Sequence, residues 1–233
     1  MSSYPTAIED YVKVIYAHTE WQPEPITTSA LAARLGLAAS SVTEMVKKLV
    51  AQGLAEHERY GNVTLTREGT TLALRMLRRH RIIETWLVQT YGYRWDEVHD
   101  EAEILEHALS DRLLDAIDEQ LGHPTRDPHG DPIPTSYGHV TKPEAVLLRD
   151  APVGTVGTVV RVSDRDPRLL RHLVAESITL DRQLTVLGRK PYGGAFAVRV
   201  EGAIGDRDLG EAALESIWIA VSAPVAPVEL PAQ

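Results

Sequence analysis

The chain contains no cysteine among its 233 residues. Disulfide bonds, thiolate metal sites and a cysteine nucleophile are therefore excluded. Long hydrophobic runs are also missing, since none approaches the roughly 18–20 apolar residues of a membrane-spanning helix. The first residues lack the basic and apolar regions of a signal peptide. These absences lead us to expect a cytoplasmic protein with no membrane partner.

Signatures of catalysis are equally scarce. We find no glycine-rich phosphate loop and no serine in a nucleophile elbow. The pair Glu106-His107 lacks the preceding histidine that a His-Glu-x-x-His zinc hydrolase would need. The sequence therefore predicts a protein that is not an enzyme.

What is present is a chain long enough for two or three modest domains, with an uneven charge distribution. The formal net charge is −9. The segment from Arg34 to Arg81 contains nine lysines and arginines but four glutamates. The segment from Ile82 to Asp166 contains seventeen acidic residues but seven basic ones. A basic segment suits phosphates and an acidic segment suits cations.

The N-terminal third has the pattern of a winged helix-turn-helix. Apolar spacing predicts helices over 7–17, 29–35 and about 40–52, followed by two short strands within 56–66. Thr27 or Thr28 can cap the second helix, and Ser40-Ser41 can cap the third. A generic three-helix bundle with a hairpin is the alternative, but it would not account for the small-residue turn and the basic flank.

In this motif the second helix of the pair enters the DNA major groove through its N-terminal part. That helix would be the one beginning near Ser40, with two lysines one turn further along. The candidate DNA-binding residues are Thr28, Ser40, Ser41, Thr43, Lys47 and Lys48.

The rest of the chain divides into a helical and a β-rich part. Amphipathic helices are expected over 70–90, 95–111 and 111–121, then a proline-rich loop over 122–134, strands over 154–162, 183–189, 195–200 and 216–221, a helix over 167–176, and a disordered tail from Ala223. We predict a mainly α fold in three domains: a DNA-binding domain (1–71), a helical dimerisation and metal-binding domain (72–140), and a small barrel of the SH3 type (141–233).

Metal-ligating residues recur at helical spacing in the acidic segment. His99, Glu103, Glu106 and His107 fall on one helix face, and His80 and Glu84 are one turn apart on the preceding helix. Two such faces would form a cage of nitrogen and oxygen ligands. Taken one at a time, each of these residues is more simply explained as part of a solvated helix surface. A helical-bundle metal enzyme or metal-storage protein is a second alternative, although its Glu-x-x-His motif appears once and loosely, at 103–107.

The sequence resembles the diphtheria toxin repressor family of metal-dependent transcriptional regulators over nearly its whole length. The matching segments are Glu9-Asp10-Tyr11, Ser41-Val42-Thr43, Arg79-His80-Arg81 with Glu84, His99-Asp100-Glu101-Ala102, Glu106-His107, Ser110-Asp111 and 130–134.

The resemblance implies two metal positions. One would be formed by Asp10, Glu103, Glu106 and His107, and the other by His80, Glu84 and His99. In the longer relatives the SH3-like domain adds a ligand, for which Asp166 is the nearest candidate, although Leu169 replaces the second polar residue.

Two positions bear on the choice of metal. Iron-sensing members have a methionine where this chain has Asp10 and a cysteine where it has Glu103. Replacing sulfur by carboxylate favours a hard, oxygen-preferring ion such as Mn²⁺. The short manganese regulators, in which two carboxylates bridge a pair of ions, have an acidic residue where this chain has Lys13.

The resemblance therefore implies a manganese-dependent repressor that binds operator double-stranded DNA as a metal-activated homodimer and controls metal-uptake genes. An iron(II)-dependent repressor of the same family is the alternative, and Co²⁺ or Zn²⁺ could substitute in vitro. Asp10 lies in the first helix of the DNA-binding domain and the other ligands lie in the dimerisation helices, so a shared ion would tie the two together.

Overall fold

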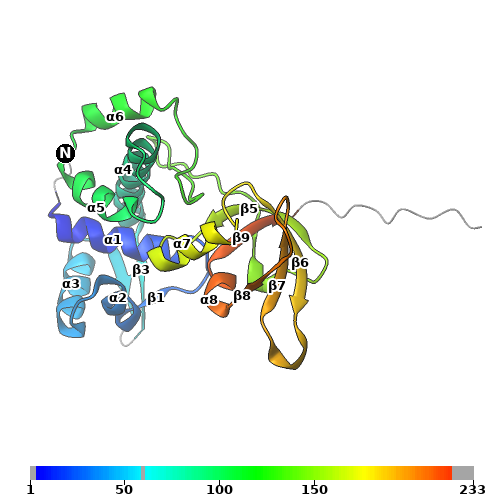
Figure 1. Ribbon diagram of the computed structural model, residues 1–233. Helices are drawn as coiled ribbons and strands as arrows, with labels where there is room; N and C mark the ends of the chain where they lie inside the picture. Colours follow the sequence, from blue (N-terminus) through cyan, green and yellow to red (C-terminus); the bar gives the residue numbers. More distant parts are fainter. Residues whose placement is uncertain (1–3, 59–60, 222–233) are drawn as a thin grey trace, which may run out of the picture. The chain divides into compact units, whose positions relative to one another are not determined.

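The computed structural model describes residues 4–58 and 61–221 of the chain. The chain forms two compact units (Figure 1). The first comprises residues 1–86, 100–125 and 133–140, and the second comprises 87–99, 126–132 and 141–233. The predicted boundaries of three domains stay a prediction, and the tail from Ala223 lies outside the described residues.

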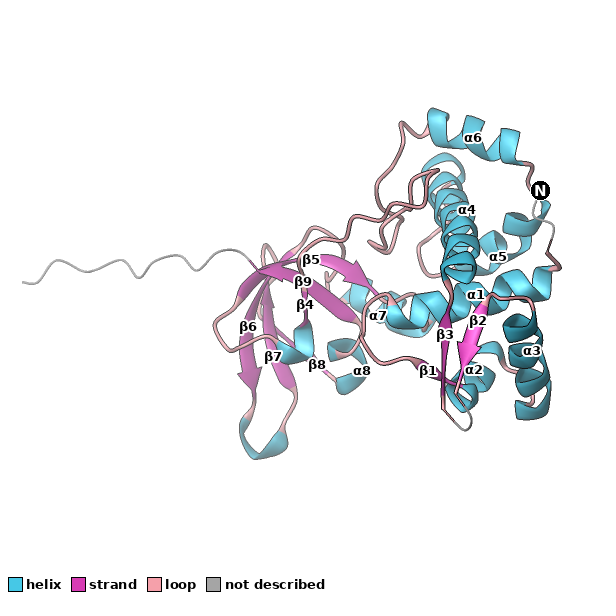
Figure 2. Ribbon diagram, turned by 180° about the vertical axis from the view of Figure 1, so that it is seen from behind, coloured by secondary structure: helices cyan, strands magenta, loops and turns pink. Residues whose placement is uncertain are grey.

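The first unit begins with the winged helix-turn-helix predicted from the sequence. Its elements are α1 (Thr6–Thr19), β1 (Ile26–Thr27), α2 (Thr28–Leu35), α3 (Ala39–Ala51), β2 (Ala55–His57) and β3 (Asn62–Leu65). The three strands form an antiparallel sheet in the order β1-β3-β2, seen beside the helices in Figure 2. Strand β1 was not predicted, because its two residues are too few to show the alternation that reveals a strand.

The helices of this domain are held by a shared apolar core. Ile8, Ile15, Leu31, Val46 and Leu49 are each at most 1% exposed. The spacing of seven residues between Ile8 and Ile15 and of three between Val46 and Leu49 puts each pair on one helix face, as the periodicity predicted. Packing of these faces positions α1, and with it the polar residues on the opposite side of that helix.

The helix ends differ in part from expectation. Thr27 caps α2 by accepting a hydrogen bond from the Ala30 amide, and Gly36 ends that helix in the left-handed conformation with φ 65°. Ser40-Ser41, however, does not cap α3: Ala38 is the cap residue, and both serines lie in the first turn with exposed side chains. Val50, near the end of α3, is 42% exposed.

Three further helices follow: α4 (Arg67–Tyr91), α5 (Val98–Ala108) and α6 (Asp111–Gln120). α5 begins later than the expected residue 95, because Arg94, Asp96 and Glu97 form a polar turn in which the Arg94 side chain donates to Asp96. Ser110 caps α6 by accepting from the Leu113 amide.

The second unit contains a six-stranded antiparallel sheet in the order β4-β9-β5-β6-β7-β8 (Figure 2). Its elements are β4 (Val146–Leu147), η1 (Leu148–Asp150), β5 (Val156–Val162), α7 (Pro167–Ala175), β6 (Gln183–Arg189), η2 (Pro191–Gly193), β7 (Phe196–Val200), β8 (Asp206–Leu209), α8 (Glu211–Leu214) and β9 (Ile217–Val221). Alternating residues such as Val159, Leu184, Val198 and Ile219 form its core. Short β4, β8 and α8 were not predicted, because their few residues carry too little periodicity.

The proline-rich loop is anchored within the second unit. The Asp127 carboxylate accepts from the amides of His129 and Asp131, and His129 accepts through its carbonyl from the Val162 amide. Gly130 has φ 90°, and a Cβ there would lie 2.0 Å from the Val160 carbonyl oxygen. Glycine is therefore required for the loop to approach β5 this closely.

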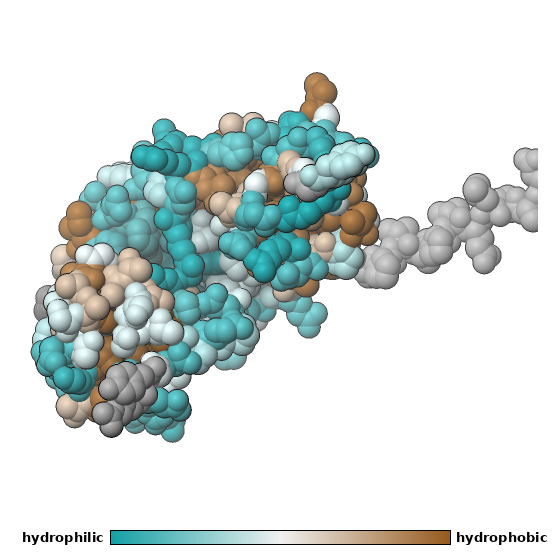
Figure 3. Space-filling view, turned by 90° about the horizontal axis from the view of Figure 1, so that it is seen from below, coloured by the Kyte–Doolittle hydropathy of each residue, from teal (hydrophilic) through white to brown (hydrophobic). Residues whose placement is uncertain are grey.

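Hydrophilic residues cover much of the face shown in Figure 3. In Figure 3 hydrophobic residues appear as separate areas among hydrophilic ones on the face shown, which is ordinary for a folded chain. Among the described residues, no helix combines the length and apolar character needed to cross a bilayer.

Candidate metal centre and DNA-binding face

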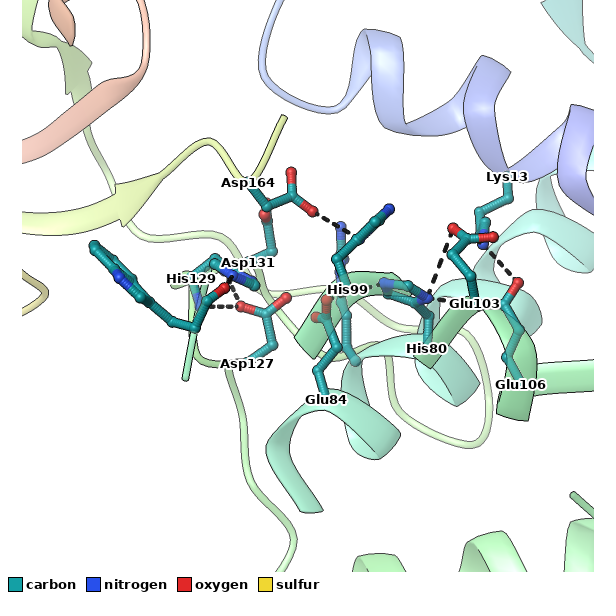
Figure 4. Close-up of polar contacts among 12 residues, drawn as sticks. Lys13, His80, Glu84, His99, Glu103, Glu106, Asp127, His129, Asp131 and Asp164 are labelled. Atoms are coloured by element: carbon teal, nitrogen blue, oxygen red, sulfur yellow. Dashed lines mark hydrogen bonds and ion pairs between the residues drawn. The ribbon is translucent and has the colours of Figure 1, made fainter. Parts of the chain in front are cut away.

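The candidate ligands of the first unit come from three helices. α1 supplies Asp10, α4 supplies His80 and Glu84, and α5 supplies Glu103, Glu106 and His107. Figure 4 shows the α4 and α5 side chains converging, with Lys13 reaching toward them from α1. Residues far apart in the sequence are thus brought into one polar cluster.

Asp10, Glu106 and His107 form a metal-compatible group within the first unit. One ligand atom from each lies within 4.8 Å of the others. The Nε2 atom of His107 is 2.9 Å from Asp10 Oδ1 and 3.3 Å from Glu106 Oε1. Glu106 is fully buried. Two carboxylates and one imidazole, without sulfur, are a donor set that suits a divalent transition ion.

A third carboxylate, that of Glu9, contacts His107 from its other side. His107 Nδ1 lies 2.9 Å from Glu9 Oε2, and the second oxygen of Glu9, Oε1, is buried without a hydrogen-bond partner among the described residues. A metal-ligating histidine commonly donates its other N–H to a carboxylate in this way. The geometry around His107 therefore fits a metal ligand.

Carboxylates on both sides favour the charged imidazolium when no metal is bound. Hydrogen bonding to Glu106 raises the pKa of His107 to about 9, with further contributions from Glu9 and Asp10. An ion at Nε2 would replace that proton and leave Nδ1–H donating to Glu9. Burial raises the pKa of Asp10, so removal of this carboxylate from water is a cost that a bound cation would offset.

His80 bridges two buried glutamates. Its Nδ1 lies 2.6 Å from Glu106 Oε2, and its Nε2 lies 3.1 Å from Glu84 Oε1. Burial by itself would lower the pKa of His80, but the charge of Glu84 and both hydrogen bonds raise it to about 9. For Glu106, burial would raise the pKa, but hydrogen bonds from His107 and His80 hold it well below its usual range.

His99 belongs to the second unit, so its assembly with His80 and Glu84 stays a prediction. Within that unit, His99 Nδ1 is 3.3 Å from Asp164 Oδ2. Asp166, the predicted ligand of the SH3-like part, instead caps α7: its carboxylate accepts from the amides of Arg168 and Leu169. Sequence reasoning overlooked Asp164, although it lies two residues before Asp166.

The predicted DNA-binding residues lie at or near the surface of the winged helix-turn-helix. Ser40, Ser41, Lys47 and Lys48 are exposed. Thr28 and Thr43 are half-buried, and the Thr43 hydroxyl donates to the Ala39 carbonyl. The surface they form combines hydroxyls with two ammonium groups, which is suited to phosphates and base edges. Their contacts with DNA stay a prediction.

Comparison with known proteins agrees with this geometry. Residues 5–63 match the iron dependent repressor N-terminal DNA binding domain, residues 66–135 match its metal binding and dimerisation domain, and residues 146–220 match the FeoA domain. The iron-dependent repressor IdeR of Mycobacterium tuberculosis is 33% identical over 161 residues, covering 66% of this chain and 70% of that protein. The chain belongs to the diphtheria toxin repressor family.

Members of this family are metal-dependent transcriptional repressors. The family resemblance inferred from the sequence is therefore confirmed. A regulator from Methanocaldococcus jannaschii, MJ0568, is 39% identical over 111 residues, covering 48% of this chain and 89% of that protein. A solved manganese-dependent transcriptional repressor in complex with manganese is 48% identical, covers 92% of this chain and 100% of its own, and has a TM-score of 0.88. The manganese regulator SloR is 30% identical, covers 92% and 98%, and has a TM-score of 0.78.

Proposed function

We propose that this family member is a manganese-dependent repressor that binds operator DNA as a metal-activated homodimer and controls metal-uptake genes. The observation that carries the proposal is the convergence of Asp10 from α1 with Glu106 and His107 from α5. α1 belongs to the DNA-binding domain, and α5 to the metal binding and dimerisation domain. An ion held by all three residues would link the two.

Linkage explains how such an ion would act as a switch. A ligand shifts a conformational equilibrium only if it binds one arrangement more tightly than the other. Since Asp10 completes the ligand set only when α1 lies against α5, Mn²⁺ would favour that arrangement. If this arrangement is the one that fits the operator, DNA binding and metal binding strengthen each other by the same factor.

The choice of Mn²⁺ over Fe²⁺ is supported by the donors at positions 10 and 103. Both are carboxylates, which are harder ligands than sulfur and suit Mn²⁺. The manganese-dependent repressor at 48% identity supports the same assignment. The relatives named as iron-dependent repressors keep Fe²⁺ as the second candidate. Co²⁺ and Zn²⁺ are expected to substitute in vitro.

We assign the second metal position to His80, Glu84 and His99, as the sequence resemblance implies. Asp164 takes the place of Asp166 as the candidate ligand from the SH3-like part, because Asp164 faces His99 while Asp166 is engaged at the start of α7. The predicted cytoplasmic location follows from the proposed function.

The homodimer is supported by exposed apolar side chains on the helices of the dimerisation domain. Ile104 on α5 is 69% exposed, and Leu113 on α6 is 49% exposed. Burial of these aliphatic side chains in an interface would remove apolar surface from water and stabilise the pair of chains. A second copy of the chain would bury them and present two recognition helices to a palindromic operator.

DNA binding titrated with metal tests this proposal. An operator selected from a random DNA pool would be titrated with Mn²⁺, anaerobic Fe²⁺, Co²⁺ and Zn²⁺ in parallel, with fluorescence anisotropy as the readout. We expect Mn²⁺ to increase DNA affinity by about 5- to 150-fold, the usual range of allosteric coupling. Asp10→Asn should abolish that increase, whereas the exposed control Glu119→Gln should retain it. Equal DNA affinity with and without metal would contradict the proposal, and activation at lower free Fe²⁺ than Mn²⁺ would favour the iron alternative.

A further inference from the structure

Lys13 occupies an unusual position for a lysine in a metal-binding protein. Its side chain is 8% exposed, and its ammonium donates to Glu103 Oε1 at 2.7 Å and to Glu106 Oε1 at 2.5 Å (Figure 4). Lysine is almost never buried unless it is paired. Here its partners are two of the carboxylates assigned to the metal centre.

The ammonium stands where an ion bridging these two glutamates would stand. Glu106 Oε1 contacts Lys13 Nζ and also lies 3.3 Å from His107 Nε2, while Glu106 Oε2 is 2.6 Å from His80. Both carboxylate oxygens of Glu106 therefore already contact cationic or hydrogen-bonding side chains. A divalent ion placed between Glu103 and Glu106 would compete with Lys13 for the same oxygens and meet a positive charge at close range.

Lys13 cannot easily withdraw. It lies on the side of α1 opposite the apolar residues Ile8, Val12 and Ile15, which are at most 1% exposed and hold that face of the helix in the core of the DNA-binding domain. The core therefore fixes the face of α1 that turns toward α5. The packing of α1 thus holds the buried Lys13 ammonium against Glu103 and Glu106.

We propose that Lys13 is a built-in cation that replaces a second metal ion between Glu103 and Glu106, so that the Asp10–Glu106–His107 group holds one divalent ion. This inference rests on the proposed function. The two ion pairs also link residues 90 and 93 positions apart, so they join α1 to α5 before any metal binds. Lys13 thereby sets the number of ions at this position and holds the Asp10 ligand near its partners.

The test counts Mn²⁺ ions bound per chain and examines their magnetic coupling. All variants carry His99→Ala, which removes a ligand of the other metal position. We expect the Lys13 protein to bind one Mn²⁺ with an uncoupled electron paramagnetic resonance spectrum. Lys13→Glu and Lys13→Met should each bind one additional ion and show an exchange-coupled pair, with Lys13→Glu binding it more tightly. Lys13→Arg should retain the single ion.

Lys142→Glu, the same charge reversal at an exposed site, should leave the count unchanged. An exchange-coupled pair in the Lys13 protein, or an unchanged count in both Lys13→Glu and Lys13→Met, would overturn the inference. If circular dichroism shows that Lys13→Glu does not fold, the ion count of Lys13→Met and the spectrum of the protein that keeps Lys13 test the inference. A protein with Lys13 and His99 intact that binds no Mn²⁺ would instead refute the proposed function.

Discussion

Buried carboxylates of the two units differ in their partners. In the first unit, Glu106 contacts His80, His107 and Lys13. In the second, Asp131 is paired with Arg161 at 2.7 Å, and both side chains are buried. Arginine remains charged at any ordinary pH, whereas histidine can release its proton to make way for a metal. The same burial thus gives a fixed structural pair in one unit and, under the proposed function, an exchangeable cation site in the other.

The composition of each group reinforces this difference. The first-unit cluster combines five carboxylates with one lysine and two histidines: Glu9, Asp10, Glu84, Glu103, Glu106, Lys13, His80 and His107. In the second unit, Asp96 is matched by Arg94 and Arg171, and Asp127 by backbone amides. An excess of carboxylates attracts a cation, while matched carboxylates stabilise the fold.

The largest effect should come from Glu106→Gln. This change leaves His80, His107 and Lys13 without their shared negative charge, and breaking a buried charge pair costs about 3–5 kcal/mol. In a protein that also carries His99→Ala, which removes a ligand of the other metal position, we expect Mn²⁺ binding in isothermal titration calorimetry to disappear and the melting temperature of the metal-free protein to fall. Retention of Mn²⁺ binding would show that Glu106 is not a ligand.

Asp131→Asn should destabilise the protein without affecting the metal. The buried Arg161 would lose its counter-charge, at a cost of about 3 kcal/mol in the free energy of unfolding. Denaturant unfolding measures that cost, and calorimetry of the folded variant should give an unchanged Mn²⁺ affinity. If Asp131→Asn changed the Mn²⁺ affinity as much as Glu106→Gln does, the Asp131–Arg161 pair would not be purely structural.

Glu103→Cys tests the basis of metal preference with a smaller expected effect. Thiolate is a softer ligand than carboxylate, so the ratio of Fe²⁺ to Mn²⁺ affinity should rise by about tenfold, or about 1.4 kcal/mol. Anaerobic DNA-binding titrations with each metal give this ratio. Glu103→Asp, which keeps the carboxylate, should retain the Mn²⁺ preference. If the ratio of Fe²⁺ to Mn²⁺ affinity were unchanged in Glu103→Cys, the carboxylate at position 103 would not determine the preference for Mn²⁺.

The smallest effect should be the acid sensitivity contributed by Asp96. Hydrogen bonding from Arg94, aided by Arg171, lowers the pKa of Asp96 to about 2. A carboxylate with a lowered pKa in the folded state contributes stability above its unfolded pKa of about 3.9, and loses it as the pH falls toward 2. Asp96→Asn should therefore be less stable at pH 7, with a difference that narrows between about pH 4 and 2 in thermal unfolding curves. If the stability difference between the two proteins stayed constant from about pH 4 to 2, the lowered pKa of Asp96 would not be its cause.

Much of the fold could be predicted because its longer elements carry strong periodicity. The winged helix, α4 and strand β6 follow the expected positions closely. The elements that were missed, such as β1 and β4, have two residues each, and pairing rather than local pattern defines them. α3 shows a different limit, since its serines were suited to capping but the chain begins the helix at Ala39.

The candidate site was predictable only in part for a similar reason. Helical spacing places Glu103, Glu106 and His107 on one face, whatever they pack against. The role of Glu9 as partner of His107, and the choice of Asp164 over Asp166, depend on contacts across long sequence separations. No local pattern encodes such contacts.

The sequence by itself determined the chemistry of this protein: carboxylate and imidazole donors at helical spacing, no sulfur, and a basic segment beside an acidic one. The tertiary structure decided how that chemistry is arranged. Packing of α1 brings Lys13 between Glu103 and Glu106 and Asp10 to His107. Spacing specifies which side chains share one helix face, but only the packing of helices specifies which faces meet and which charges must be balanced there.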